Sequence, residues 1–246
     1  MFDWGIIAAA IAMFEQWPGF LTGILAIILI GTRQHGIAVL GHDGAHGTIC
    51  RPKWLNDIFA HVAFLPFGID LARYRAFHFA HHRFVGTDLD PEQELKAQAA
   101  PAWDMPASSR HILLLSAKDF LVWPALRELV PFMALASSPM AFLAGLGFWA
   151  IVTLTLGYWP VLLWYTALTT SFWASNRLRI WTEHQGTDDT HCVSATWWQR
   201  FLFLPHNIGW HCEHHARPDL AFYQLPLLRE KMRTKAVSVG ELWAGY

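Results

Sequence analysis

The sequence predicts an all-α integral membrane protein, with about four transmembrane helices in two hairpins and a histidine-rich cap on the cytoplasmic side. Two observations concern composition: 54% of the 246 residues are hydrophobic and 15% are charged, which is too apolar for an ordinary soluble domain. The third is the presence of 14 histidines, too many to be incidental in a chain of this size. No internal repeat or soluble appendage is apparent, so residues 1–246 are expected to form a single domain.

Charge and cysteine content exclude several classes of protein. The formal net charge of −1 offers no basic field for nucleic acid, so no nucleic-acid partner is expected. The three cysteines, Cys50, Cys192 and Cys212, form neither a CxxC pair nor an even set, so neither a disulfide framework nor a thiolate zinc site is expected. The N-terminal apolar run lacks the basic residues of a secretory signal and is expected to be retained.

The first hairpin is predicted from two apolar runs near the N-terminus. Residues 19–40 carry a single charge, Arg33, and are long enough to cross a hydrocarbon core of about 30 Å at ~1.5 Å per residue. Residues 4–14 are a shorter apolar run that precedes them. Pro18 and Gly19 provide a turn between the two runs, so they are expected to form antiparallel helices.

A second hairpin and two helices that do not cross the membrane are predicted farther along the chain. Residues 131–156 and 159–176 contain no charged side chain, and a glycine and a proline lie at their junction, as in a helical hairpin. Residues 56–69 are interrupted by a proline and suit a re-entrant or interfacial helix. Residues 109–128 mix charges with leucine at helical spacing and suit a helix on the membrane surface.

The placement of basic residues predicts the topology. All 18 Lys and Arg residues fall between Arg33 and Arg127 or between Arg177 and Lys235. Two hairpins that leave and return to the cytoplasmic side would place every basic residue there, as the positive-inside bias expects. The sequence therefore predicts a multi-pass protein with both termini and all histidine-bearing segments on the cytoplasmic side.

Eight of the histidines fall into three patterns at helical spacing. The segments are HDGAH with His42 and His46, HFAHH with His78, His81 and His82, and HCEHH with His211, His214 and His215. Residues three and four apart share a helix face, so each segment presents its imidazoles together. With the predicted topology, all eight imidazoles can converge under one helical bundle.

Eight clustered imidazoles suit two metal ions, because a mononuclear zinc site uses three or four ligands. The zinc protease motif HExxH is absent, and haem ligation needs histidines that face each other within spans. Imidazole binds iron, copper and zinc alike, so the residues alone leave the metal open. Four histidines outside the patterns are expected to be satisfied core or surface residues, namely His35, His61, His111 and His191.

The three histidine patterns, in this order and separated by apolar hairpins, resemble those of the membrane fatty acid desaturase and hydroxylase superfamily, which includes acyl-lipid desaturases, carotenoid ketolases and alkane hydroxylases. The resemblance covers roughly residues 33–228. The segments AHHRFVGTDLDPE and NIGWHCEHHARP are similar to segments of acyl-lipid desaturases and carotenoid ketolases. The resemblance implies a further ligand after the last transmembrane helix, which the segment RLRIWTEHQG places at His184.

The resemblance also implies the chemistry. It implies two iron ions bound by these nine histidines, O2 as cosubstrate, and desaturation or hydroxylation of a fatty acyl or lipid-like substrate. A carotenoid ketolase or hydroxylase is the alternative enzyme, and a haem-binding or a non-catalytic metal-binding membrane protein is the hypothesis from a different class. No haem module is apparent in the sequence, so a separate electron donor of the ferredoxin, rubredoxin or cytochrome type is expected.

Other residues are predicted to support such a site. Carboxylates orient ligating imidazoles by accepting the second ring N–H, and the candidates are Asp43, Asp88, Asp90, Glu183 and Glu213. For each of them a solvated loop charge is the alternative. Asn207 resembles a polar residue in related third patterns that orients metal or water. Four tryptophans near the ligands are expected to wall a substrate tunnel or to form an interfacial aromatic belt, namely Trp181, Trp197, Trp198 and Trp210.

Overall fold

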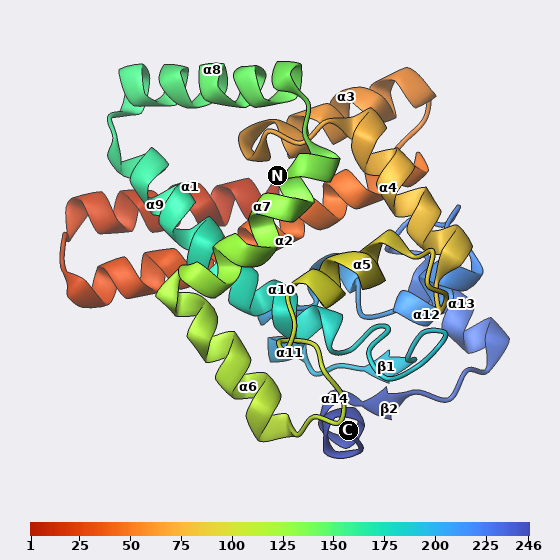
Figure 1. The fold of residues 1–246 in the computed structure, drawn as a ribbon. Coiled ribbons are helices and arrows are strands. Elements are labelled where there is room, and N and C mark those ends of the chain that lie inside the picture. Colours follow the sequence, from red (N-terminus) through yellow and green to blue (C-terminus); the bar gives the residue numbers. More distant parts are fainter.

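Helices account for nearly all regular structure in the computed structural model, which describes residues 1–246 (Figure 1). The first half of the chain contains α1 (Phe2–Gln16), α2 (Phe20–His46), α3 (Lys53–Phe64), η1 (Leu65–Phe67), α4 (Leu71–Phe84), α5 (Pro91–Gln98), α6 (Ser109–Lys118) and η2 (Asp119–Leu121). The second half contains α7 (Trp123–Ala136), α8 (Pro139–Leu156), α9 (Trp159–Ala167), η3 (Leu168–Phe172), α10 (Trp173–Ile180), α11 (Trp197–Leu202), η4 (Pro205–Asn207), α12 (His211–Ala216), α13 (Leu225–Met232) and α14 (Val239–Ala244). Two short strands, β1 (Val193–Ser194) and β2 (Val237–Ser238), pair in parallel. The prediction of a helical fold is confirmed.

Two helices, α2 and α8, are long and apolar enough to cross a membrane. A third candidate is the pair formed by α3 with η1 and by α4, which is bent by 97° and so fits the re-entrant helix predicted for residues 56–69. Of the four predicted spans, residues 19–40 and 131–156 contain a helix of this kind. The other two are α1, which has 15 residues, and α9, which continues through the π-helical segment η3 into α10.

Two segments predicted as single helices are divided, and each division has a local cause. Residues 131–156 split between α7 and α8, where the side chain of Ser138 caps α8 by accepting a hydrogen bond from the backbone N–H of Ala141. Residues 109–128 split between α6 and α7, where Val122 has a φ of 67°. That conformation lies outside the right-handed helical region, so the helix cannot pass through it.

The turns of the two predicted hairpins lie on the same side of the structure. The turn between α1 and α2 and the turn between α8 and α9 lie on the left of Figure 1, whereas α4, α12 and α13 lie on the right. At the turn end, the ring of Phe14 meets that of Trp159 edge-on with centroids 5.0 Å apart, and Trp17 and Tyr158 are exposed. Exposed aromatic side chains are typical of a membrane–water interface.

Glycine allows α2 to pack closely against the π-helical segment η3. A Cβ at Gly31 would lie 2.0 Å from Oγ of Ser171, so a side chain there would force the two elements apart. The hydroxyl of Ser171 donates a hydrogen bond of 2.6 Å to the backbone oxygen of Ile27, which satisfies a polar group inside an apolar span. π-Helical turns often occur at functional sites, and this one borders the cavity described below.

The chain after α10 holds α12 in place through long-range contacts. Glu213 of α12 accepts hydrogen bonds of 2.5 and 2.7 Å from Arg229 of α13. Cys212, also on α12, forms a disulfide bond with Cys192, which directly precedes β1. The expectation that the cysteines form no disulfide was therefore wrong for this pair. The two residues are 20 positions apart and match no motif, so only the fold brings them together.

Candidate metal centre

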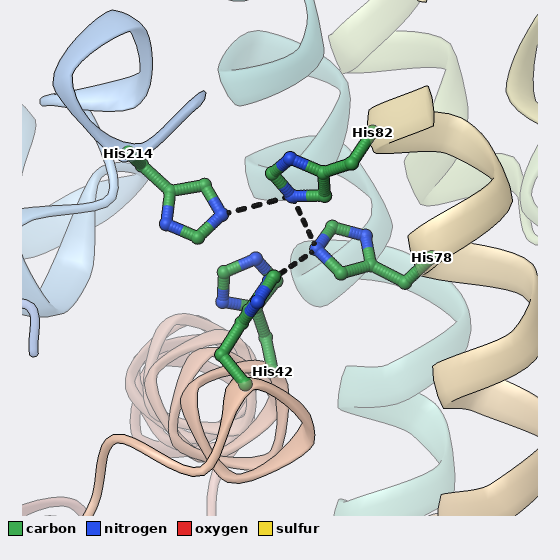
Figure 2. A group of neighbouring side chains, drawn as sticks. His42, His78, His82 and His214 are labelled. Carbon is green, nitrogen blue, oxygen red and sulfur yellow. Dashed lines mark hydrogen bonds between the residues drawn. The ribbon is translucent and has the colours of Figure 1, made fainter. Parts of the chain in front are cut away.

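All nine predicted ligands lie together at one end of the bundle. They come from the last turns of α2, from α4, from the turn after α10 and from α12. Their candidate ligand atoms form two groups, and within each group all of these atoms lie within 4.8 Å of one another. The first group contains His42, His46, His78, His82 and His214, and the second contains His81, His184, His211 and His215. Figure 2 shows the labelled rings of the first group turned toward a common centre.

Helical geometry explains how the HxxHH segments serve both groups. Adjacent residues on a helix point about 100° apart, so His81 and His82 face different groups, as do His214 and His215. Residues four apart share a face, so His78 joins His82. The two groups adjoin where the rings of His82 and His215 stack with centroids 4.1 Å apart.

Hydrogen bonds to the outer ring nitrogens fix the protonation of two imidazoles in the second group. Nδ1 of His81 lies 3.0 Å from both carboxylate oxygens of Asp90, and Nδ1 of His184 lies 2.9 Å from the backbone oxygen of Asp189. Because a carboxylate and a carbonyl oxygen only accept, both Nδ1 atoms carry the ring proton. The Nε2 atom of each ring is therefore a bare acceptor.

These bare nitrogens face one another in an arrangement that fits metal binding. Nε2 of His184 lies 3.1 Å from Nε2 of His81 and 2.7 Å from Nε2 of His211. The lone pairs on Nε2 of His81 and His184 cannot form a hydrogen bond with each other, whereas a cation between them binds both. In the first group, Nε2 of His42 is buried without a hydrogen-bond partner. The donor set of both groups thus fits metal ions.

Burial favours the neutral form of most of these imidazoles, although at His81 the nearby carboxylates of Glu92 and Asp90 outweigh burial and raise the pKa. Burial lowers the pKa of His184 to about 3 and the pKa of His214 well below its usual value, because the charged ring would lose its hydration. A neutral imidazole keeps the lone pair that a metal ion requires. Burial also raises the pKa of Glu183 to about 7, and Oε1 of this residue lies 3.4 Å from Nδ1 of His211.

Some of the predicted supporting residues lie beside the centre and others do not. Three carboxylates approach an Nδ1 atom of the nine histidines, namely Asp43, Asp90 and Glu183. The prediction was wrong for Glu213, which pairs with Arg229, and for Asp88, which is exposed. The side-chain amide of Asn207 donates a hydrogen bond to the backbone oxygen of Phe222, and its role in orienting metal or water stays a prediction.

An apolar cavity of about 170 Å³ adjoins both histidine groups. It lies between α2, α4, α5, α7, η3 and α10, and 17 of its 27 lining residues are hydrophobic. His42 and His78 of the first group and His211 of the second group line it. Apolar, largely preformed cavities of this kind are typical ligand sites, so an apolar chain in the cavity would reach the imidazoles.

The tryptophans predicted to wall a tunnel do not border this cavity. Trp197 is 81% exposed and Trp198 is 45% exposed, so neither lies against the cavity. Trp181 and Trp210 are buried but are absent from its lining. The cavity is instead bordered by two other tryptophans, Trp103 and Trp173.

His35 lies at the cavity, although the sequence predicted it to be a satisfied core or surface residue. It is 1% exposed and lines the cavity. One sequence feature could have predicted this position: His35 precedes His42 by seven residues, which is two helical turns, so both residues lie on the same face of α2. By contrast, Glu92 and Lys96 reach the cavity from α5, a segment without any pattern that predicts this position.

Comparison with known proteins gives a consistent family match. A model of the fatty acid desaturase family matches residues 17–244. An sn-1 oleoyl-lipid 12-desaturase from Picosynechococcus sp. is 27% identical over 255 residues, which covers 89% of this chain and 69% of that protein. An sn-1 acyl-lipid omega-3 desaturase (ferredoxin) from Nostoc sp. is 26% identical over 106 residues, covering 43% of this chain and 29% of that protein.

A relative with a second kind of activity in its name is also similar. The human sphingolipid delta(4)-desaturase/C4-monooxygenase is 27% identical over 218 residues, which covers 81% of this chain and 62% of that protein. The matched part of this chain thus covers between 29% and 67% of the length of three of its relatives. Desaturation and oxygen insertion both occur among the named activities of these similar proteins.

Proposed function

We propose a function for this chain, which belongs to the fatty acid desaturase family and is an oxidoreductase. It uses two iron ions and O2 to desaturate or hydroxylate a fatty acyl or other lipid-like chain. The observation that carries the proposal is the convergence of nine imidazoles in two adjoining groups beside an apolar cavity. A histidine-bound iron pair would supply the oxidising power needed to remove hydrogen from an unactivated C–H bond.

The proposed ligand assignment follows the two groups. One iron ion would be held by His42, His46, His78, His82 and His214, and the other by His81, His184, His211 and His215. Asp43 and Asp90 would hold the ring protons of His42 and His81 on Nδ1, which keeps Nε2 of each ring free. We propose no catalytic residue beyond these ligands, so the remaining side chains act by position and by excluding water.

The cavity wall is proposed to hold the lipid chain. Phe132 and Met133 from α7, together with Leu168 and Phe172 from the π-helical segment, would bury its methylene groups, each of which contributes about 0.8 kcal/mol of transfer free energy. A chain held in this way has few accessible conformations, so one region of it is kept beside the imidazoles. The same apolar wall would keep bulk water away from the reacting carbon.

A separate electron donor is part of the proposal. One relative carries ferredoxin in its name, which favours a ferredoxin-type donor over a rubredoxin or cytochrome type. The relatives reported above are named as lipid desaturases, which favours an acyl or sphingoid substrate over the carotenoid alternative. The monooxygenase activity in the name of one relative is the observation that keeps hydroxylation beside desaturation.

We propose that the protein is multi-pass, with the histidine centre on the cytoplasmic side, because all Lys and Arg residues lie in the two stretches of sequence that also contain the histidines. A reporter fused at Tyr158 should then be detected on the opposite side from reporters at Arg110 and Tyr246. The measurement is activity of a compartment-specific reporter in intact cells. Detection of all three reporters on one side would refute this topology.

Lipid profiling of a host that makes no comparable enzyme tests the function. Expression of the chain with a ferredoxin and its reductase should produce new unsaturated or hydroxylated acyl chains, and these should depend on O2. The matched control is His78→Ala, which leaves the apolar helices intact but removes one imidazole of the first group. An unchanged acyl profile together with altered carotenoids in a pigment-producing host would contradict the acyl assignment and favour the ketolase alternative.

A further inference from the structure

We infer that the cavity binds a lipid chain that bears a hydroxyl group, and that Nε2 of His35 accepts a hydrogen bond from this hydroxyl. The inference rests on the proposed function, because it names a substrate class for the same site. It concerns a residue outside both histidine groups. His35 would act as a specificity-determining residue for the position of the chain.

The protonation of His35 follows from its neighbours. The hydroxyl of Ser175 lies 2.7 Å from the backbone oxygen of Leu202 and donates its single proton there. The same hydroxyl oxygen lies 2.8 Å from Nδ1 of His35, so it must accept a proton from that nitrogen. Nδ1 of His35 therefore carries the ring proton, and Nε2 is a bare acceptor.

This acceptor has no partner within the protein. Nε2 of His35 is buried and without a hydrogen bond, and the whole residue is 1% exposed. Buried polar groups are nearly always paired, and a buried acceptor left unpaired is costly. Because His35 lines the cavity, a molecule in the cavity is the available source of a donor.

The surroundings favour an organic hydroxyl over a water molecule. On the same face of α2, Ala38 and Val39 line the cavity beside His35, and the ring of Phe172 packs edge-on against the imidazole with centroids 5.8 Å apart. A buried water needs two to four polar partners, which Ala38, Val39 and Phe172 do not offer. Asn176 and Arg179 also line the cavity, but Arg179 already donates to Glu183 and to the side-chain oxygen of Asn176. A hydroxyl attached to an apolar chain needs only one partner while its chain contacts the apolar wall.

The distance between His35 and His42 along α2 determines which carbon of the chain would lie at the histidine centre. His35 precedes His42 by two helical turns, about 10 Å along the axis of α2 at ~1.5 Å per residue. Both residues line the same cavity. A chain anchored at His35 therefore presents to the histidine centre a carbon several bonds away from its hydroxyl, and the hydroxyl position selects which carbon that is.

Binding of positional isomers tests the inference without requiring turnover. The iron-loaded protein in detergent would be equilibrated with radiolabelled palmitate, which is then displaced by a series of monohydroxypalmitates. At least one isomer should bind about tenfold more tightly than palmitate, because its hydroxyl pairs a buried acceptor. In His35→Leu this isomer should lose its advantage, and in His35→Gln, which retains an acceptor oxygen, part of the advantage should remain.

Controls and ratios separate the possible outcomes. The readout is the affinity for the preferred monohydroxypalmitate divided by the affinity for palmitate, so a substitution that weakens the binding of both chains equally leaves this ratio unchanged. The control His111→Leu changes an exposed residue and should keep the native ratio. The inference is overturned if no isomer is preferred by the native protein, or if the preference survives in His35→Leu. Palmitate binding and acyl oxidation without any hydroxyl preference would leave the proposed function standing, whereas failure of every chain to bind would count against both.

Discussion

Replacing His184 by alanine should reduce product formation by a factor on the order of 100 or more, because it removes the imidazole at the middle of the second group. Nε2 of His184 lies 3.1 Å from Nε2 of His81 and 2.7 Å from Nε2 of His211, so its loss leaves three imidazoles in that group. The measurement is product formed per mole of purified protein, together with metal content of the same sample. Bound iron should fall by about half.

The matched controls are two exposed histidines, His61→Ala and His111→Ala, which lie outside both groups. Both variants should retain near-native turnover and iron, since substitutions at exposed positions rarely change stability by more than about 0.5 kcal/mol. His184 is the sharpest of the nine cases, because no repeated spacing pattern supports it. Near-native iron content and turnover in His184→Ala would remove it from the proposed ligands.

Replacing Arg177 by leucine should destabilise the protein by about 3–5 kcal/mol, the usual cost of removing one partner from a buried ion pair. Arg177 donates to both carboxylate oxygens of Asp119 at 2.6 and 2.9 Å and to Glu128 at 2.5 Å. The side chains of Arg177 and Asp119 are 1% and 0% exposed. Without the guanidinium, two carboxylates remain buried with no cation to compensate them.

The measurement for Arg177 is the thermal unfolding temperature in detergent, which should fall by many degrees or be lost together with expression. Arg217→Leu is the matched control, since Arg217 forms the same kind of pair with Asp219 but both side chains are more than half exposed. That control should unfold near the native temperature. Equal unfolding temperatures for the two variants would show that the buried network does not stabilise α10 against η2 and α7.

Local periodicity explains which parts of the centre could be predicted from the sequence. The three histidine patterns repeat at i+3 and i+4, and helices preserve such spacing whatever the surrounding fold. The structure accordingly brings all eight of these residues together, and His184 with them. The division into two groups also follows from helix geometry, because the adjacent histidines of each HxxHH segment point in different directions.

Long-range contacts and helix interruptions could not be predicted from local spacing in the sequence. The pairing of Cys192 with Cys212 and the contact of Glu213 with Arg229 depend on how distant segments pack. The break between α7 and α8 falls inside an uncharged stretch, where hydropathy alone cannot separate one helix from two. His35 lacked a pattern of its own, and only the cavity distinguishes it from an ordinary core histidine.

The number of iron ions held by each histidine group tests the central claim most directly. Protein purified anaerobically after growth with iron should contain about two iron ions per chain by elemental analysis. His42→Ala/His46→Ala and His211→Ala/His215→Ala each remove two imidazoles, from the first and the second group respectively, so each variant should retain about one iron, and the variant with all four changes should retain none. A single tightly bound zinc with no iron in the native protein, or unchanged iron in the variant with all four changes, would contradict a two-iron centre built from these histidines.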